Sequence, residues 1–142
     1  MKDDTVNILL VEDDEVDVMN VQRAFKKNHI KNELYVAGNG LEALAMLRGD
    51  GVETIIPKPK IILLDINMPR MNGIEFLTEL RMDPEFKCIS VFVLTTSNDD
   101  KDRIAAYDLN VAGYILKPVE LDNFIEAVTT LNLYWTLTEL PL

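Results

Sequence analysis

Short, continuous apolar runs recur along the chain and alternate with segments of helical periodicity. The apolar runs span residues 7–11, 34–37, 61–64, 89–94 and 113–116. Such a run is typical of a strand that is covered on both faces, because the side chains on either face are then buried. The pattern therefore predicts five short, buried strands.

Between these runs, apolar residues return at spacings of three and four positions, the period of a helix that packs one face on a core. Helices are expected around residues 14–28, 41–47, 74–80, 98–109 and 121–131. Asn39 and Glu42 resemble a capping box at the start of the second helix. Gly49 and Gly51 are expected to end that helix.

Strands that alternate with helices predict an α/β domain, because parallel strands are joined by right-handed crossovers through helices. The expected product is a doubly wound parallel sheet of five strands flanked by five helices. Such sheets commonly adopt the strand order 2-1-3-4-5, which makes strands one, three, four and five neighbours. Their working groups lie beyond the carboxyl ends of the strands, near the switch in strand order.

The positions at the ends of the predicted strands carry a particular set of polar side chains. These are Glu12, Asp13 and Asp14 after the first strand, Asp65 after the third, Thr95 after the fourth and Lys117 after the fifth. Crowded carboxylates resist ionising unless a cation joins them, and Mg²⁺ prefers such oxygen ligands. Lys117 and Thr95 would suit phosphoryl oxygens. Asp65, the only acid at the end of its strand, is the candidate nucleophile for an acyl phosphate.

Composition narrows the class of protein. The 142 residues, 48% of them hydrophobic and 27% charged, fit one globular domain. The 24 Asp and Glu outnumber the 14 Lys and Arg, which disfavours nucleic acid as a partner because duplex binding depends on basic residues. One Cys and one His exclude a disulfide framework and Cys- or His-based metal clusters. Without a membrane-length apolar run or a signal peptide, we expect a cytoplasmic protein that does not contact a membrane.

Five motifs together resemble the response-regulator receiver domain of two-component signalling. They lie at residues 11–14 (Val-Glu-Asp-Asp), 64–69 (Leu-Asp-Ile-Asn-Met-Pro), 72–73 (Asn-Gly), 94–96 (Leu-Thr-Thr) and 113–118 (Gly-Tyr-Ile-Leu-Lys-Pro). Any one alone would be a weak signal, whereas five in this order are specific. The resemblance implies a flavodoxin-like receiver domain over residues 1–132, followed by an apolar extension over residues 133–142. This extension and the long segment before the third strand make the chain most similar to the single-domain, phytochrome-associated type.

The resemblance implies that Asp65 accepts a phosphoryl group from a histidine kinase, for which a phytochrome is one candidate. Mg²⁺ would be the cofactor, held by Glu12, Asp13, Asp65 and the backbone carbonyl of Asn67. The acidic pair is Glu-Asp where the family has Asp-Asp, and a third acid, Asp14, follows it. Which of these three acids contacts the metal directly stays open.

For the transferred phosphoryl group, the resemblance implies contacts from Thr95 and Lys117. Thr95 and Tyr114 would form a switch that changes the face of the fourth helix, fifth strand and fifth helix. A cis peptide would join Lys117 to Pro118. Thr96 stands where the family often has Ala or Gly, and we expect its bulk to restrict water and slow the loss of the phosphoryl group.

Three other functions fit parts of the pattern. A Mg²⁺-dependent aspartyl phosphatase of similar fold typically has a second Asp two positions after the nucleophile, where this chain has Asn67. A pseudo-receiver would act by contact alone and would not need the set of acids, Thr and Lys. A flavin carrier needs a phosphate-binding loop where this chain has three acids. We therefore expect a signalling protein, not an enzyme, that assists only its own phosphotransfer and slow dephosphorylation.

The extension over residues 133–142 contains the only Trp and four Leu. It either folds back onto its own domain or contacts a second copy or the kinase, since exposed apolar patches often mark interfaces. With the habit of the family, it favours a homodimer through the face of the fourth helix, fifth strand and fifth helix.

Overall fold

The computed structural model describes residues 6–27, 32–51, 54–68, 70–95, 104 and 109–116. Its elements are β1 (Ile8–Val11), α1 (Glu15–Lys27), β2 (Leu34–Ala37), α2 (Gly40–Arg48), β3 (Ile61–Asp65), α3 (Gly73–Met82), β4 (Ser90–Thr95) and β5 (Gly113–Leu116). All five predicted strands and the first three predicted helices are present. The helices predicted around residues 98–109 and 121–131 lie almost entirely outside the described residues.

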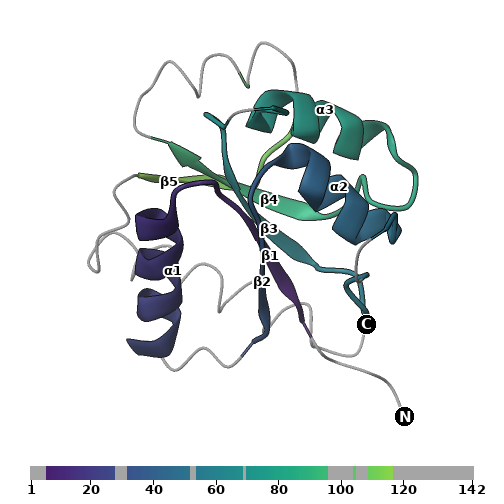
Figure 1. Cartoon of the computed structure of the whole chain (residues 1–142). Coiled ribbons are helices and arrows are strands. Elements are labelled where there is room, and N and C mark those ends of the chain that lie inside the picture. Colours follow the sequence, from purple (N-terminus) through teal and green to yellow (C-terminus); the bar gives the residue numbers. More distant parts are fainter. Residues whose placement is uncertain are drawn as a thin grey trace.

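The strands form one parallel sheet in the order β2-β1-β3-β4-β5, as predicted (Figure 1). Figure 1 shows α1 on one face of the sheet and α2 with α3 on the other, which gives three layers. Val11 pairs with Leu64, and Asp65 pairs with Leu94. This register brings the carboxyl ends of β1, β3 and β4 together at one edge of the sheet. We call this edge the carboxyl edge, and the opposite one the amino edge.

Alternate side chains of the strands build two separate cores, one on each face of the sheet. The face towards α2 and α3 contains Leu9, Val11, Ile62, Leu64, Val91 and Val93, packed with Leu44, Leu47, Leu77 and Leu80. The face towards α1 contains Ile8, Leu10, Ile61, Leu63, Phe92 and Leu94, packed with Val21, Ala24 and Phe25. Since both faces of the sheet are buried, the sequences of the strands are continuous apolar runs and do not alternate between apolar and polar residues.

The second helix begins and ends near the predicted residues, with one difference at its start. The Asn39 side chain accepts a hydrogen bond from the Glu42 backbone N–H at 2.9 Å, and Gly49 ends α2 in the left-handed conformation. The Glu42 carboxylate, however, accepts from the Gly38 N–H at 3.1 Å and not from the cap residue. The complete capping box lies instead at α3, between Asn72 and Glu75.

At the amino edge, one guanidinium in the last turn of α3 links the segments that lead into β4 and β5. Arg81 donates to the carbonyls of Leu109 and Asn110 at 2.9 and 2.8 Å, in the segment before β5. It also donates to the carbonyls of Lys87 and Ile89 at 2.7 and 2.8 Å, in the segment before β4. Burial lowers the pKa of Arg81 below its ordinary value. Arg81 therefore holds the starts of two neighbouring strands to one helix.

None of the described helices is both long and apolar enough to cross a membrane.

Candidate functional site

Three carboxylates meet at the carboxyl edge of the sheet. Glu12 and Asp13 directly follow β1, and Asp65 is the last residue of β3. One carboxylate oxygen from each lies within 4.8 Å of the others. The side chains of Glu12 and Asp65 are buried, at 1% and 3% exposure, whereas Asp13 is exposed. We call Glu12, Asp13 and Asp65 the acid cluster.

Hydrogen bonds donated by backbone N–H groups fix the turns that carry Glu12 and Asp65. The Glu12 N–H donates to the Ala37 carbonyl at 2.9 Å, which continues the pairing of β1 with β2 by one residue. Glu12 Oε1 accepts from the Asp14 N–H at 3.2 Å, and Asp65 Oδ1 accepts from the Asn67 N–H at 3.2 Å. The side chains at the two strand ends are thus held by the first residues of the loops that follow.

Gly73 lets α3 start close to the end of β3. Its N–H donates to the Ile66 carbonyl at 2.9 Å. A Cβ at this position would lie 2.5 Å from the Asp65 carbonyl oxygen and 2.7 Å from the Ile66 Cα. Both are backbone atoms, so the overlap could be relieved only by moving the chain that carries Asp65.

Asp14, which sequence reasoning could not distinguish from its two neighbours, caps α1. Its Oδ1 accepts from the N–H groups of Val16 and Asp17 at 2.8 and 3.1 Å. These bonds satisfy two of the amide groups that a helix leaves unpaired at its start. Among the described residues, the acids close enough to share one ion are therefore those of the acid cluster, without Asp14.

The donor set of the acid cluster fits a hard divalent cation. It offers only carboxylate oxygens, which suit Mg²⁺, Ca²⁺ and Mn²⁺ and not metals that prefer sulfur or imidazole. Two of the three carboxylates are buried, so water screens their mutual repulsion poorly. A dication between them would remove that repulsion.

Two further predicted residues lie on β4 and β5, the next two strands after β3 in the order of the sheet. Thr95 ends β4 and is 2% exposed, one position beyond the residue that pairs with Asp65. Tyr114 lies on β5 opposite Val93, and its side chain is 36% exposed while the next residue, Ile115, is buried. The exposed Asn67 follows β3, as expected.

The remaining predicted residues are not part of the described structure. Lys117, Pro118, Thr96 and the extension over residues 133–142 all lie outside the described residues. The phosphoryl contact of Lys117 and the cis peptide before Pro118 therefore stay predictions. Within the described residues, the cis peptide joins Ile56 to Pro57.

Comparison with known proteins assigns the family. Residues 8–129 match the model of the response regulator receiver domain. The response regulator Rcp1 of Synechocystis sp. is 40% identical over 128 residues, which cover 90% of this chain and 87% of that protein. A crystal structure of the Mn²⁺-bound form of Rcp1 has a TM-score of 0.75 and 39% identity, covering 92% of this chain and 94% of that one.

Two other solved structures are similar over nearly the whole chain. A two-component response regulator from Legionella pneumophila is 46% identical with a TM-score of 0.78, covering 90% of this chain and 98% of that one. The phosphorylated cyanobacterial phytochrome response regulator RcpA is 36% identical with a TM-score of 0.78, covering 94% and 96%. The similarities to Rcp1 and RcpA confirm the resemblance to phytochrome-associated response regulators. The chain therefore belongs to the receiver-domain family of response regulators, the signalling proteins of two-component systems.

Proposed function

We propose that this chain is a stand-alone response regulator that accepts a phosphoryl group on Asp65 from a histidine of a partner kinase. The observation that carries the proposal is the meeting of Glu12, Asp13 and Asp65 within 4.8 Å at the carboxyl edge. The Mn²⁺-bound form of Rcp1 supports a divalent metal in this family. Mg²⁺ would be held here by the acid cluster and by the backbone carbonyl of Asn67.

Asp65 is the nucleophile in the transfer. One oxygen of its carboxylate forms the new bond to phosphorus while the bond from phosphorus to the imidazole nitrogen breaks, and the electron pair stays on that nitrogen. When bound, Mg²⁺ supplies positive charge that neutralises the carboxylates and the phosphoryl oxygens. The Asn67 N–H, which donates to Asp65 Oδ1, orients the carboxylate that reacts. Little else is required of the protein, because phosphoryl transfer depends mainly on positioning and charge.

The new phosphoryl group would be held by the Thr95 hydroxyl and the Lys117 ammonium. Phosphorylation adds about −1.5 to −2 charges at neutral pH. Movement of Thr95 towards this group would leave space for Tyr114 to turn inward, which would change the face formed by residues 98–109, β5 and residues 121–131. Moving a two-state equilibrium from 1:99 to 99:1 takes about 5.5 kcal/mol. A few charge-assisted hydrogen bonds of about 1.5–3 kcal/mol each would supply it.

The partner is a histidine kinase, and the similarity to the phytochrome response regulator RcpA supports a phytochrome as the kinase. A homodimer through the face of residues 98–109, β5 and residues 121–131 and a location in the cytoplasm belong to the same proposal. The excess of acidic residues favours protein partners over nucleic acid.

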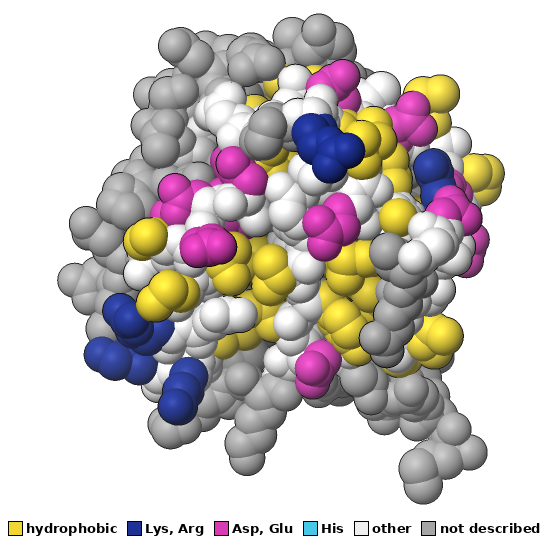
Figure 2. Space-filling view, viewed as in Figure 1, with side chains coloured by type: hydrophobic (Ala, Val, Ile, Leu, Met, Phe, Trp, Pro, Cys, Tyr) yellow, Lys and Arg dark blue, Asp and Glu magenta, His cyan; other side chains and the backbone are white. Residues whose placement is uncertain are grey.

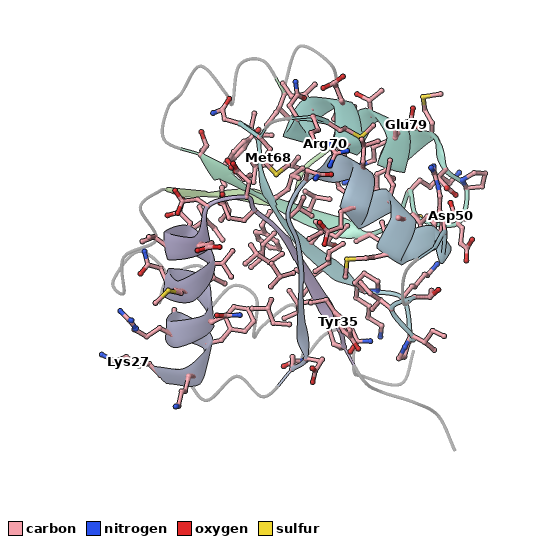
Figure 3. The ribbon with its side chains drawn as sticks, in the orientation of Figure 1. Lys27, Tyr35, Asp50, Met68, Arg70 and Glu79 are labelled. Atoms are coloured by element: carbon pink, nitrogen blue, oxygen red, sulfur yellow. The ribbon has the colours of Figure 1, made fainter. Side chains whose placement is uncertain are left out.

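The proposal is tested by weighing the intact protein after incubation with acetyl phosphate and Mg²⁺. The wild type is expected to gain one phosphoryl group, labile to base, and Asp65→Asn is expected to gain none. Asp50→Asn is a matched control, because Asp50 is an exposed acid beyond the end of α2 (Figure 3), and it should gain the group as the wild type does.

Two outcomes would favour the other functions. Rapid release of phosphate with many turnovers would point to an aspartyl phosphatase. No adduct in any condition would point to a protein that acts by contact alone.

A further inference from the structure

Basic side chains are distributed unevenly between the two edges of the sheet. Apart from Arg70, every described Lys and Arg lies in the last two turns of a helix or in a segment that leads into a strand. Lys27 and Arg48 are examples of the first kind, and Lys60 and Lys87 of the second. Both kinds lie towards the amino edge, because the helices run back along the strands that they follow (Figure 1).

Arg70 is the exception. It lies in the loop between β3 and α3, five positions after Asp65, and therefore at the carboxyl edge with the acid cluster. Figure 3 shows Arg70 near the start of α3, whereas Lys27 lies at the far end of α1. In Figure 2, the basic side chains at the lower left lie over that end of α1, and acidic side chains spread over the upper half of the visible face. Among the described residues, Arg70 is thus the one cation at the carboxyl edge.

The local structure does not favour an arginine at this position. The φ angle of Arg70 is 67°, in the left-handed region where glycine or asparagine is the usual residue. Arg70 also precedes the cap residue of α3, Asn72, by two positions, and the start of a helix carries partial positive charge. The next residue, Met71, accepts a hydrogen bond from the first residue of α2, Gly40, at 3.2 Å, so the start of a second helix lies beside this loop.

The Arg70 side chain is not used to hold the fold together. It is exposed, and its guanidinium has no hydrogen-bond or ion-pair partner among the described residues. The contrast is with Arg81, whose guanidinium donates to four backbone carbonyls. A cation in an unfavourable backbone conformation, beside two helix starts and without a partner, is available for a ligand.

We propose that Arg70 determines specificity for the donor by attracting its anionic phosphoryl group to the acid cluster. This inference rests on the proposed function, because it concerns how the donor reaches Asp65. The ligand is a phosphoryl dianion on a donor of acyl phosphate or phosphoramidate chemistry. Such a group has to approach an edge that already carries Glu12, Asp13 and Asp65, and one exposed cation there lowers the electrostatic barrier to approach.

The test compares Arg70→Gly, Arg70→Lys and Lys27→Gln with the wild type. Glycine removes the charge and suits the left-handed backbone, so this variant is expected to fold at least as well as the wild type. Arg70→Lys keeps the charge, and Lys27→Gln removes a charge at the far end of α1. The second-order rate constant for phosphorylation is measured with saturating Mg²⁺, using acetyl phosphate (two negative charges) and phosphoramidate (net one negative charge at neutral pH).

At low ionic strength, Arg70→Gly is expected to lower the rate constant for acetyl phosphate about three- to tenfold, and that for phosphoramidate less. The difference in rate constant between Arg70→Gly and the wild type should disappear near 1 M salt, where the screening length falls to about 3 Å. Arg70→Lys and Lys27→Gln should stay within about a factor of two of the wild type, because the first keeps the positive charge at position 70 and the second changes a charge at the far end of α1. Calorimetry without donor should show Mg²⁺ binding to Arg70→Gly unchanged or tighter, since removing a cation cannot weaken attraction for another cation.

The inference is overturned if Arg70→Gly and the wild type react equally fast at low ionic strength. It is also overturned if the loss is the same for both donors, or if the loss is independent of salt, which would indicate a structural effect on the loop. Failure of the proposed function looks different, because the wild type itself would then gain no phosphoryl group from either donor.

Discussion

At the amino edge of the sheet, the half-buried charge of Arg81 is matched by four backbone carbonyls within the same chain. At the carboxyl edge, the buried carboxylates of Glu12 and Asp65 lie beside a third acid, Asp13. The first arrangement is complete without a ligand, and it stabilises the starts of β4 and β5. The second brings like charges together, and a bound cation would offset their repulsion.

From this difference we expect the carboxyl edge to contribute less stability than the amino edge when no ligand is bound. Ligands that bind only the folded state stabilise it by mass action, so the carboxyl edge should make stability depend on divalent cations. The amino edge should contribute the same stability with or without them. Substitutions at the two edges can separate these contributions.

The largest effect is expected from Arg81→Ala. It removes hydrogen bonds to the carbonyls of Leu109, Asn110, Lys87 and Ile89 and should lower the free energy of unfolding by about 2–4 kcal/mol. Urea denaturation measures this loss, which should be the same with and without Mg²⁺.

Arg48→Ala is the matched control for this prediction. Arg48 also lies at the end of a helix, but its partners are the side chains of Asp83 and Glu79 at 3.3 and 3.8 Å on the surface. Such pairs contribute less than about 1 kcal/mol. Equal losses from Arg81→Ala and Arg48→Ala would contradict the role assigned to Arg81.

Gly73→Ala is expected to have the next largest effect. The added Cβ would overlap the backbone of Asp65 and Ile66 and should cost about 1–3 kcal/mol. Because relieving this overlap moves Asp65, the stabilisation of the fold by Mg²⁺ should also fall. In Gly51→Ala the new Cβ meets open space and the cost, about 1 kcal/mol, comes only from a φ of 78°. Gly51→Ala should keep the full stabilisation by Mg²⁺. If both variants lost this stabilisation to the same extent, the explanation by overlap at Gly73 would be contradicted.

Stabilisation of the fold by Mg²⁺ should be lost in Asp13→Asn and kept in Asp14→Asn. Without divalent cations, Asp13→Asn removes one of three repelling charges and should raise stability by about 1 kcal/mol. In the wild type, Mg²⁺ at ten times its dissociation constant should add about 1.4 kcal/mol, and Asp13→Asn should lose most of this gain.

Asp14→Asn should keep the Mg²⁺ response, because asparagine also caps a helix and Asp14 caps α1. Thermal unfolding with and without Mg²⁺ measures both variants. If Asp14→Asn lost the response and Asp13→Asn kept it, the assignment of the two acids would be reversed.

The smallest effect is expected from Thr96→Ala, a prediction that rests on the sequence since Thr96 lies outside the described residues. Removing its bulk should admit water and shorten the lifetime of the acyl phosphate by up to about fivefold, a change in barrier of about 1 kcal/mol. Following the decay of the phosphorylated mass over time measures it. A wild-type lifetime that is shorter than or equal to that of the variant would contradict the prediction.

Much of the carboxyl edge was predictable because strand ends can be located from sequence. Continuous apolar runs locate the strands, and parallel strands place their carboxyl ends together, so Glu12, Asp13, Asp65 and Thr95 were expected at one edge. The separate role of Asp14 could not be predicted, since capping a helix and binding a metal both use a carboxylate oxygen. The structure separates the two roles through the bonds of Asp14 to α1.

The hydrogen bonds at the amino edge could not be predicted from the sequence in the same way. Arg81 bonds to carbonyls 6 to 29 residues away, and a backbone carbonyl is present at every position of a chain. A basic residue in the last turn of a helix is already expected from the helix dipole. The left-handed conformation of Arg70 was missed for a similar reason, because arginine is not a residue that marks such turns.

The central claim is that Asp65, within the acid cluster, is the residue that carries the phosphoryl group. The most direct measurement treats the protein with acetyl phosphate and Mg²⁺, reduces it with borohydride and locates the resulting homoserine by tandem mass spectrometry, because borohydride reduces an aspartyl phosphate to homoserine. Homoserine is expected at position 65 only, and only when Mg²⁺ is present. Homoserine at position 13 or 14, or at position 65 to the same extent with the metal chelated, would contradict the claim.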